Sequence, residues 1–271
     1  MKKTFLTTIF LLISILCFSQ LDSIKKSQLD SIREFYENGK FKFKSYYENG
    51  TLKTEGNIVD GETNGNWKYY YENGQIKNSL VRENDLIKNT SYYQNGNIRD
   101  VGYFDLDDRR QRKWKEYYEN GNLFSEGSFL NGKQNGKWYE LYENGQLKRT
   151  GNQSEGKRNG IWKYYHENGQ LKGEGNYFNE KENGIWKVYY DNGQLEKEGN
   201  VIDGKEDGTW KYFYKTSELQ SEGNYNNGKR DGIWYGFHEN GTKRRKSFFN
   251  MGKITEETCW DKKGKKIECE K

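Results

Sequence analysis

The chain has 271 residues, 31 of them glycine, and contains neither proline nor alanine. Only 32% of its residues are hydrophobic whereas 16% are aromatic, so any buried layer must depend on large rings rather than on many aliphatic side chains. Its formal charge of +5 is spread over 31% charged residues of both signs, which does not favour nucleic acid as a partner. Without the best helix former, the composition favours strands joined by tight turns.

The first residues have the three-part layout of a secretory signal peptide. Lys2 and Lys3 supply a basic start, an apolar run extends from Phe5 to Phe18, and a small residue closes the segment. The apolar run holds about 14 residues, whereas a helix that spans a membrane needs about 20. We therefore predict a signal peptide over residues 1–19.

The mature chain is expected to begin at Gln20 with a linker or short helix over residues 20–32. A lipoprotein signal would modify Cys17, but Leu16 stands before it, where such signals carry a small residue. Export is therefore favoured over lipidation, and the protein is expected in the periplasm, on the cell surface or in the medium. No later segment is apolar enough to span a membrane, so no membrane contact is indicated beyond the signal peptide.

One short unit repeats over residues 33–271. Tryptophans recur 24 positions apart, and an acidic residue followed by Asn-Gly stands five positions after most of them. The array holds about ten units, with an irregular stretch near 81–112, where Asn89 takes the tryptophan position, and a terminal hairpin over 254–271. The tryptophans with this spacing are Trp138, Trp162, Trp186, Trp210 and Trp234.

Each unit is predicted to fold as a β-hairpin around its Asn-Gly dipeptide. With Asn168-Gly169 as a two-residue type I′ turn, counting outward places Trp162 opposite Gly175. Lys163 likewise faces Glu174, so opposite charges meet across the strands. Each large ring then covers a glycine that would otherwise leave a hole in the sheet. The residues with this structural role are Trp138, Trp162, Trp186, Trp210, Trp234, Gly151, Gly175, Gly199 and Gly223.

A second turn, clearest at Asn227-Gly228-Lys229, joins one hairpin to the next. Two strands per unit therefore continue in chain order as an antiparallel meander. The predicted fold class is all-β, an elongated antiparallel β-meander of tandem hairpins with a period of about 24 residues.

The chain resembles the variant MORN repeats of bacterial proteins in its pattern Trp-Lys-x-Tyr-Tyr-Glu-Asn-Gly-Gln-Leu-Lys-x-Glu-Gly-Asn-Tyr and in its Asn-Gly-Lys connector. The resemblance covers roughly residues 33–269 and implies β-hairpin arrays that serve protein association or, in some proposals, lipid contact. Many proteins with such repeats are grouped with the YwqK-like antitoxin family, named for a cytoplasmic partner that neutralises a toxin. The predicted signal peptide departs from that cytoplasmic role.

The terminal hairpin carries two cysteines, and an oxidising compartment would allow them to form a disulfide. Cys259 and Cys269 flank Gly264 at five residues on each side. A hairpin centred on Gly264 would bring them across from each other, so a disulfide is predicted. The alternative is two unpaired thiols, because turn geometry decides whether the two side chains share a face.

The repeats offer no convincing constellation of catalytic, cofactor-binding or metal-binding residues. The two histidines, His166 and His238, stand where other units have tyrosine, and they are interpreted as packing residues. Paired carboxylates for hydrolysis would have to converge in a cleft, which a flat ribbon does not offer. The sequence therefore predicts no enzyme and no cofactor or metal.

One further row of aromatic residues lies three positions after the tryptophan position, on the more polar face. Such rings could bind a protein or glycan with little loss of entropy, and they form the candidate interaction surface. The alternative is that each ring only covers the lysine stem opposite it and stabilises the sheet. The row consists of Tyr70, Tyr117, Tyr165, Tyr189, Phe213 and Phe237.

These observations favour a non-enzymatic, exported repeat protein that acts as a protein-interaction scaffold at the cell envelope. A toxin-neutralising immunity protein is an alternative that rests on the family resemblance alone. A cell-wall or glycan-binding module is a second alternative, suggested by the aromatic-rich units. The expected partner is a protein, for example a toxin or an envelope protein.

Overall fold

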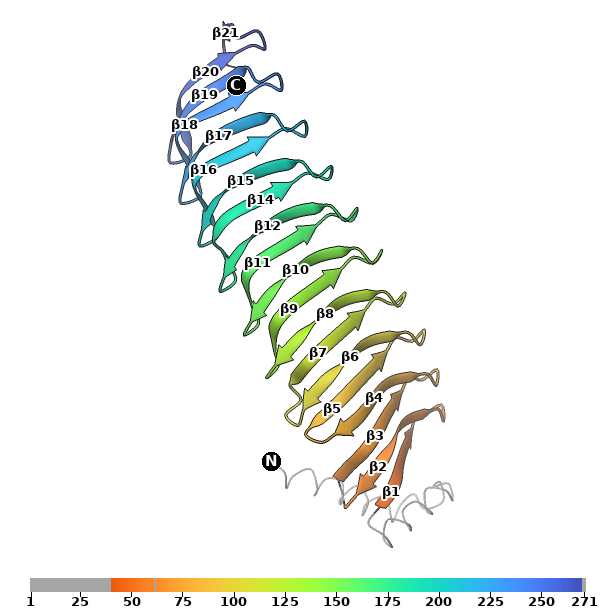
Figure 1. The fold of residues 1–271 in the computed structure, drawn as a ribbon. Coiled ribbons are helices and arrows are strands. Elements are labelled where there is room, and N and C mark those ends of the chain that lie inside the picture. Colours follow the sequence, from red (N-terminus) through yellow and green to blue (C-terminus); the bar gives the residue numbers. More distant parts are fainter. Residues whose placement is uncertain (1–39, 61, 270–271) are drawn as a thin grey trace. The chain divides into compact units, whose positions relative to one another are not determined.

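The computed structural model describes residues 40–60 and 62–269 (Figure 1). The predicted signal peptide over 1–19, the linker over 20–32 and the start of the array at residues 33–39 lie outside the described residues. The described part of the chain forms β-strands without a helix, each antiparallel to the strand it pairs with. The predicted all-β meander of hairpins is thereby confirmed.

The strands fall into two compact units, and the division lies at Arg109, inside the stretch predicted to be irregular. The first unit, which also includes the turn Glu119–Gly121, contains strands that pair in chain order. These strands are β1 (Lys40–Tyr46), β2 (Leu52–Val59), β3 (Glu62–Tyr70), β4 (Ile76–Glu83), β5 (Leu86–Tyr92) and β6 (Ile98–Asp105).

The second unit begins at Arg110 and continues the same order of pairing, with β13 and β14 sharing the edge of β12. Its strands are β7 (Arg110–Tyr117), β8 (Leu123–Leu130), β9 (Lys133–Leu141), β10 (Leu147–Ser154), β11 (Lys157–Tyr165), β12 (Leu171–Phe178), β13 (Lys181–Glu182), β14 (Gly184–Tyr189), β15 (Leu195–Ile202), β16 (Lys205–Phe213), β17 (Leu219–Asn226), β18 (Lys229–Phe237), β19 (Lys243–Asn250), β20 (Lys253–Trp260) and β21 (Lys266–Ile267).

The Glu-Asn-Gly turns are three-residue loops, so the predicted two-residue type I′ turn is wrong. At Asn168-Gly169, the amide of Gly169 donates to the His166 carbonyl at 2.9 Å, and the amide of His166 donates to the Gln170 carbonyl at 2.8 Å. Gly169 has a φ of 85°, whereas Asn168 is not in the positive-φ region that a type I′ turn requires. The loop is therefore a type I turn followed by a left-handed glycine.

The longer loop is compensated by a β-bulge at the end of the hairpin. Tyr165 pairs with Leu171 instead of Lys172, and the register shifts between Tyr164 and Tyr165. Beyond the bulge the predicted partners return, with Trp162 opposite Gly175 and Lys163 opposite Glu174. The prediction was thus correct in the strand centre and wrong beside the turn.

The type I′ turn occurs instead in the connector between hairpins. Asn227 and Gly228 have φ values of 52° and 80°, and they separate the paired residues Asn226 and Lys229. The Gly228 amide also donates to the carbonyl of Glu206 in the preceding unit, at 2.9 Å. Successive connectors are therefore joined by backbone hydrogen bonds as well as by strand pairing.

The tryptophans form the buried layer, but each ring covers a different glycine from the one predicted. Trp162 is 0% exposed, and its indole lies over Gly151 of the preceding strand rather than over Gly175. Its Nε1 donates to the carbonyl of Asn152 at 3.0 Å, beside the register shift that leaves Gly151 without a paired residue on β11. The same arrangement places Trp67 over Gly56, Trp138 over Gly127, Trp186 over Gly175, Trp210 over Gly199 and Trp234 over Gly223.

Further aromatic rings connect the tryptophans along this face. Tyr177 lies edge-on between Trp162 and Trp186, with ring centroids at 6.4 and 5.3 Å. Tyr225 lies in the same way against Trp234, and Phe129 against Trp138. Because edge-to-face pairs are favourable arrangements of aromatic rings, these contacts stabilise the buried layer on this face.

The irregular stretch replaces the tryptophan by a small polar network. Asn89 and Ser91 are buried, and both donate a hydrogen bond to the carboxylate of Asp100. Asn89 Nδ2 lies 2.7 Å from Asp100 Oδ1. Buried polar groups are tolerated when they are hydrogen-bonded, so the strands β5 and β6 pair here without an indole.

In the terminal hairpin, Cys259 and Cys269 are linked by a disulfide, with a Cα–Cα distance of 5.3 Å. The two residues are not directly opposite each other, because Cys259 pairs with Ile267. The cause is the same three-residue loop, in which Gly264 donates to the Asp261 carbonyl at 3.0 Å.

Candidate interaction surface

The sheet of the second unit has two different faces. The indole rings lie on one side, which we call the tryptophan face, and residues next to them in sequence point to the other side, which we call the opposite face. Lysine and glutamate pairs cross the opposite face, for example Lys163–Glu174 at 3.2 Å and Lys187–Glu198 at 3.6 Å. The predicted charge pairs are therefore present at these two positions.

The histidines belong to a ladder of side-chain hydrogen bonds between hairpins. Tyr142 donates its hydroxyl to the Tyr165 carbonyl of the next hairpin at 2.9 Å, and Tyr190 does the same to Phe213 at 2.8 Å. In this ladder His166 Nε2 lies 3.0 Å from the Tyr189 carbonyl. His238 Nε2 likewise lies 3.0 Å from the carbonyl of Trp260. Since a carbonyl only accepts, Nε2 must carry the proton, and each imidazole replaces a tyrosine hydroxyl.

Asparagines of the Glu-Asn-Gly turns form a second ladder. The side chain of Asn168 accepts from the amide of Gln170 at 3.0 Å and donates to the carbonyl of Asp191 in the next turn at 2.8 Å. Asn144, Asn192 and Asn240 repeat the second contact. Asparagine thus fixes its own turn and connects it to the next, so its recurrence has a structural cause.

The predicted aromatic row is half-buried at all six positions, Tyr70, Tyr117, Tyr165, Tyr189, Phe213 and Phe237. Four of these residues pair with a leucine across the hairpin, as Tyr189 does with Leu195. Tyr70 donates to Glu55 at 2.7 Å, and burial together with this bond raises the pKa of Tyr70 to about 12. The row therefore takes part in packing within the sheet and presents only part of each ring to solvent.

A group of exposed large apolar side chains of the second unit lies elsewhere on the opposite face. Ile161, Phe178, Ile185 and Ile202 are 63%, 62%, 60% and 49% exposed, and they come from the strands β11, β12, β14 and β15, with only the short β13 between β12 and β14. We call these four residues the apolar cluster. Each directly follows or precedes a buried Trp, Tyr or Val, which fixes its direction away from the core.

The apolar cluster was missed by sequence reasoning although a signal was present. The position before the tryptophan holds isoleucine at Ile161, Ile185 and Ile233, but Lys137 and Thr209 in other units. A position that tolerates lysine is not a core position, so isoleucine there indicates exposed apolar surface.

Glu126, a carboxylate that faces lysines on the opposite face, has a shifted pKa. Burial alone would raise the pKa of Glu126, but hydrogen bonds and charges from Lys113 and Lys115 hold it below its ordinary value. The Lys115 Nζ lies 3.2 Å from Glu126 Oε2. The ionised carboxylate is therefore favoured by folding.

Acidification is expected to remove the stabilisation that Glu126 provides. A carboxylate whose pKa is lowered by folding stabilises the protein fully above its unfolded pKa and loses that contribution as the pH falls through the folded pKa. The melting midpoint measured between pH 7 and pH 2 should fall less steeply for Glu126→Gln than for the parent chain. Parallel curves for the two proteins would contradict the assignment.

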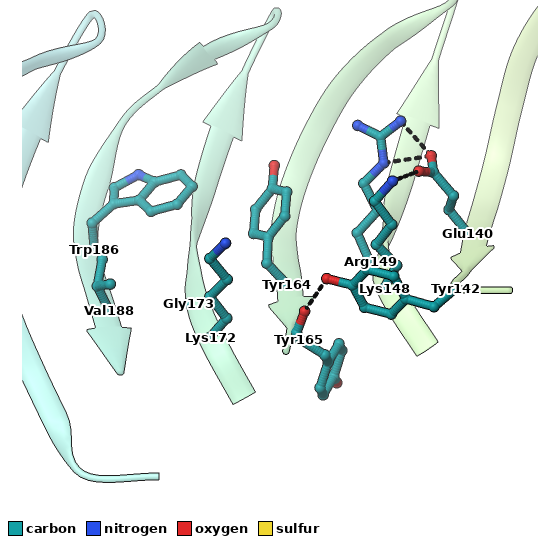
Figure 2. A pocket seen from close by; sticks show the side chains of 10 residues that line it. All are labelled: Glu140, Tyr142, Lys148, Arg149, Tyr164, Tyr165, Lys172, Gly173, Trp186 and Val188. Atoms are coloured by element: carbon teal, nitrogen blue, oxygen red, sulfur yellow. Dashed lines mark hydrogen bonds and ion pairs between the residues drawn. The ribbon is translucent and has the colours of Figure 1, made fainter. Parts of the chain in front are cut away.

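The tryptophan face carries an open hollow of about 460 Å³ in the second unit (Figure 2). Tyr164 and Trp186 form part of its wall, with ring centroids 6.3 Å apart. At its rim the buried carboxylate of Glu140 pairs with Lys148 at 3.0 Å and accepts from Arg149 Nε at 2.7 Å. The remaining lining residues are Tyr142, Tyr165, Lys172, Gly173 and Val188.

The family model of the MORN repeat variant matches eight segments that together cover more than half of the chain. The matched residues are 42–60, 63–84, 113–131, 134–153, 158–179, 182–203, 206–227 and 230–251. The chain belongs to the MORN repeat variant family. The match leaves out residues 85–112, which contain the polar network of Asn89.

Comparison with solved structures adds no functional information about this MORN repeat array. The S. aureus protein TarM is 11% identical with a TM-score of 0.25, over 54% of this chain and 25% of that chain. The complex TcdB2-TccC3 is 15% identical with a TM-score of 0.22, over 82% of this chain and 14% of that chain. This chain thus spans a quarter or less of the length of these proteins. TM-scores this low support no functional assignment.

A comparison with curated proteins gave no match. Within residues 40–60 and 62–269, no helix is long and apolar enough to cross a membrane.

Proposed function

We propose that this MORN repeat protein is a non-enzymatic scaffold that binds a protein partner through the apolar cluster on its opposite face. The observation that supports this function is the presence of four exposed apolar side chains on the strands β11, β12, β14 and β15. Several large apolar side chains exposed on one face among polar groups are characteristic of protein interaction sites.

The surroundings of the apolar cluster favour a protein partner. Ile161 lies opposite Asn176, and Ile185 lies opposite Asn200, so an apolar and a polar side chain alternate across the strands. The charged pair Lys163–Glu174 lies one position further along the same face. Apolar centres surrounded by polar and charged groups are the usual composition of such interfaces.

The strands also limit the entropy that binding would cost. The side chains of the cluster project from paired strands whose turns are joined by the asparagine ladder. A surface held in its binding conformation loses little freedom on association, so modest contact area can give useful affinity.

Export to the cell envelope is part of the proposal and is supported by the layout of residues 1–19. The disulfide between Cys259 and Cys269 is consistent with an oxidising compartment. The partner would then be an envelope protein or an exported toxin, and the identity of the captured protein distinguishes these two cases.

Three substitutions test the cluster with residues that other units already carry at the same positions. Ile161→Thr and Ile185→Thr copy Thr209, and Phe178→Ser copies Ser154, so the sheet should be retained. Crosslinking in intact cells followed by mass spectrometry should show that the triple variant loses the partner captured by the parent chain, with binding at least about tenfold weaker.

The control removes equally exposed apolar side chains outside the cluster. Leu130 and Ile254 are both 51% exposed, and the variant with Leu130→Ser and Ile254→Thr should capture the partner at the parental level. Both variants should keep the parental melting midpoint. Undiminished capture by the folded triple variant would refute the cluster as the binding surface.

A further inference from the structure

We propose that the hollow on the tryptophan face is a second binding site, for a small ring-bearing carboxylate. It lies on the other side of the sheet from the apolar cluster, so it is independent of the proposed scaffold function. The proposal rests on how the hollow arises, on the charges at its rim and on the rings in its wall.

The hollow arises where two side chains at adjoining positions are smaller than those of the neighbouring units. Gly173 stands where the two neighbouring units have Arg149 and Lys197, and Val188 stands where they have Tyr164 and Tyr212. These positions are neighbours across the sheet, since Gly173 pairs with Val188. The hollow therefore lies where the neighbouring units place the long side-chain pairs Arg149–Tyr164 and Lys197–Tyr212.

The charges at the rim favour an anion. Lys148, Arg149 and Lys172 are positive, whereas Glu140 is the one carboxylate among the lining residues. Glu140 is held by Lys148 and Arg149. Among the described residues Lys172 has no ion pair, and Figure 2 shows its side chain pointing between Tyr164 and Trp186. An ammonium group in that place is free to bind a carboxylate.

The wall of the hollow favours a ring attached to that carboxylate. The rings of Tyr164 and Trp186 are inclined by 33° to each other, and they border the space beside Lys172. Aromatic faces pack against flat rings and against the apolar face of a sugar, and a volume of about 460 Å³ accommodates one such group. An aromatic acid and a uronic acid share this chemistry.

The test is a titration of the full folded chain followed by NMR, with the indole N–H of Trp186 as the reporter. Trp186 Nε1 is buried and has no hydrogen-bond partner among the described residues, whereas the indole N–H groups of Trp162 and Trp210 donate to backbone carbonyls. The Trp186 resonance should therefore be distinguishable from those of Trp162 and Trp210. Benzoate and glucuronate serve as the two charged probes, and benzyl alcohol and glucose as their neutral counterparts. At least one charged probe should shift the resonance, and its neutral counterpart should bind at least about threefold more weakly.

Two variants locate the site and a third is the control. Val188→Tyr fills the hollow with a residue that Tyr164 and Tyr212 show to be compatible with this position, and it should weaken binding at least about tenfold. Lys172→Gln should weaken binding about threefold without changing the melting midpoint. Lys157→Gln removes an equal charge at the exposed far end of β11 and should leave binding unchanged.

Each outcome decides the proposal. Preferential binding by benzoate places an aromatic acid in the site, and preferential binding by glucuronate places an acidic sugar there. If neither probe shifts the Trp186 resonance, or if Val188→Tyr binds as well as the parent chain, the hollow is not a ligand site. Equal binding of inorganic phosphate and of the ring-bearing probes would remove the assigned role of Tyr164 and Trp186.

Discussion

Replacement of Trp162 by alanine is expected to lower the local free energy of unfolding by about 3–5 kcal/mol. The indole is fully buried over Gly151, donates to the Asn152 carbonyl and contacts the ring of Tyr177. Its removal leaves a cavity that a single-layered sheet has no second layer to fill. The two neighbouring hairpins should be affected most, because a repeat array is stabilised by nearest-neighbour contacts.

Amide hydrogen exchange is the suitable measurement, since it reports the opening of each hairpin separately. The matched control is Ile161→Ala, one residue away and pointing to the opposite face, where the change should be within about 0.5 kcal/mol. Similar losses of protection for the two variants would contradict the assignment of the tryptophan face as the core.

The period, the strand order and the central register were accessible to sequence reasoning because the chain repeats the same solution many times. Trp162 opposite Gly175 and Lys163 opposite Glu174 are matches that recur in other units, and a register shifted by one residue would break them in each. Repetition therefore supplied the constraint that a single hairpin lacks.

The turn types could not be assigned in the same way, because both turns contain the same dipeptide. Asn168-Gly169 belongs to a three-residue loop, whereas Asn227-Gly228 forms a two-residue turn. The bulge between Tyr164 and Tyr165 compensates for the difference in loop length, so the strand pattern beyond the turn is unchanged. The hydrophobic pattern of the strands therefore does not distinguish a two-residue turn from a three-residue loop.

The sites were harder to predict than the fold because they depend on positions at which individual units differ from the common repeat. The search for converging catalytic groups found none, while the hollow follows from the small residues Gly173 and Val188. Two residues of the apolar cluster, Ile161 and Ile185, stand at a position that is lysine in another unit. Both signals are departures from the unit and become visible only when the two faces of each strand are known.

The strand register and the ring positions in the structure differ in which glycine lies beneath which indole. Register alone places Trp162 opposite Gly175, but the structure places the ring of Trp186 over Gly175. A Cβ added to Gly175 would approach that ring more closely than 3.0 Å. Gly175→Ala is therefore expected to destabilise the hairpin by about 1–3 kcal/mol, as overpacking of a core does.

A control and a double-mutant cycle make this prediction decisive. Gly236→Ala adds a Cβ at an ordinary 3.5 Å from Arg245 and should be nearly neutral in the same exchange measurement. Gly175→Ala combined with Trp186→Ala should lose less stability than the sum of the two single changes, because the clash disappears with the ring. Combined with Trp162→Ala, the same change should be closer to additive. The reverse pattern of coupling would show that each indole covers the glycine of its own hairpin, and that the core is organised within units rather than between them.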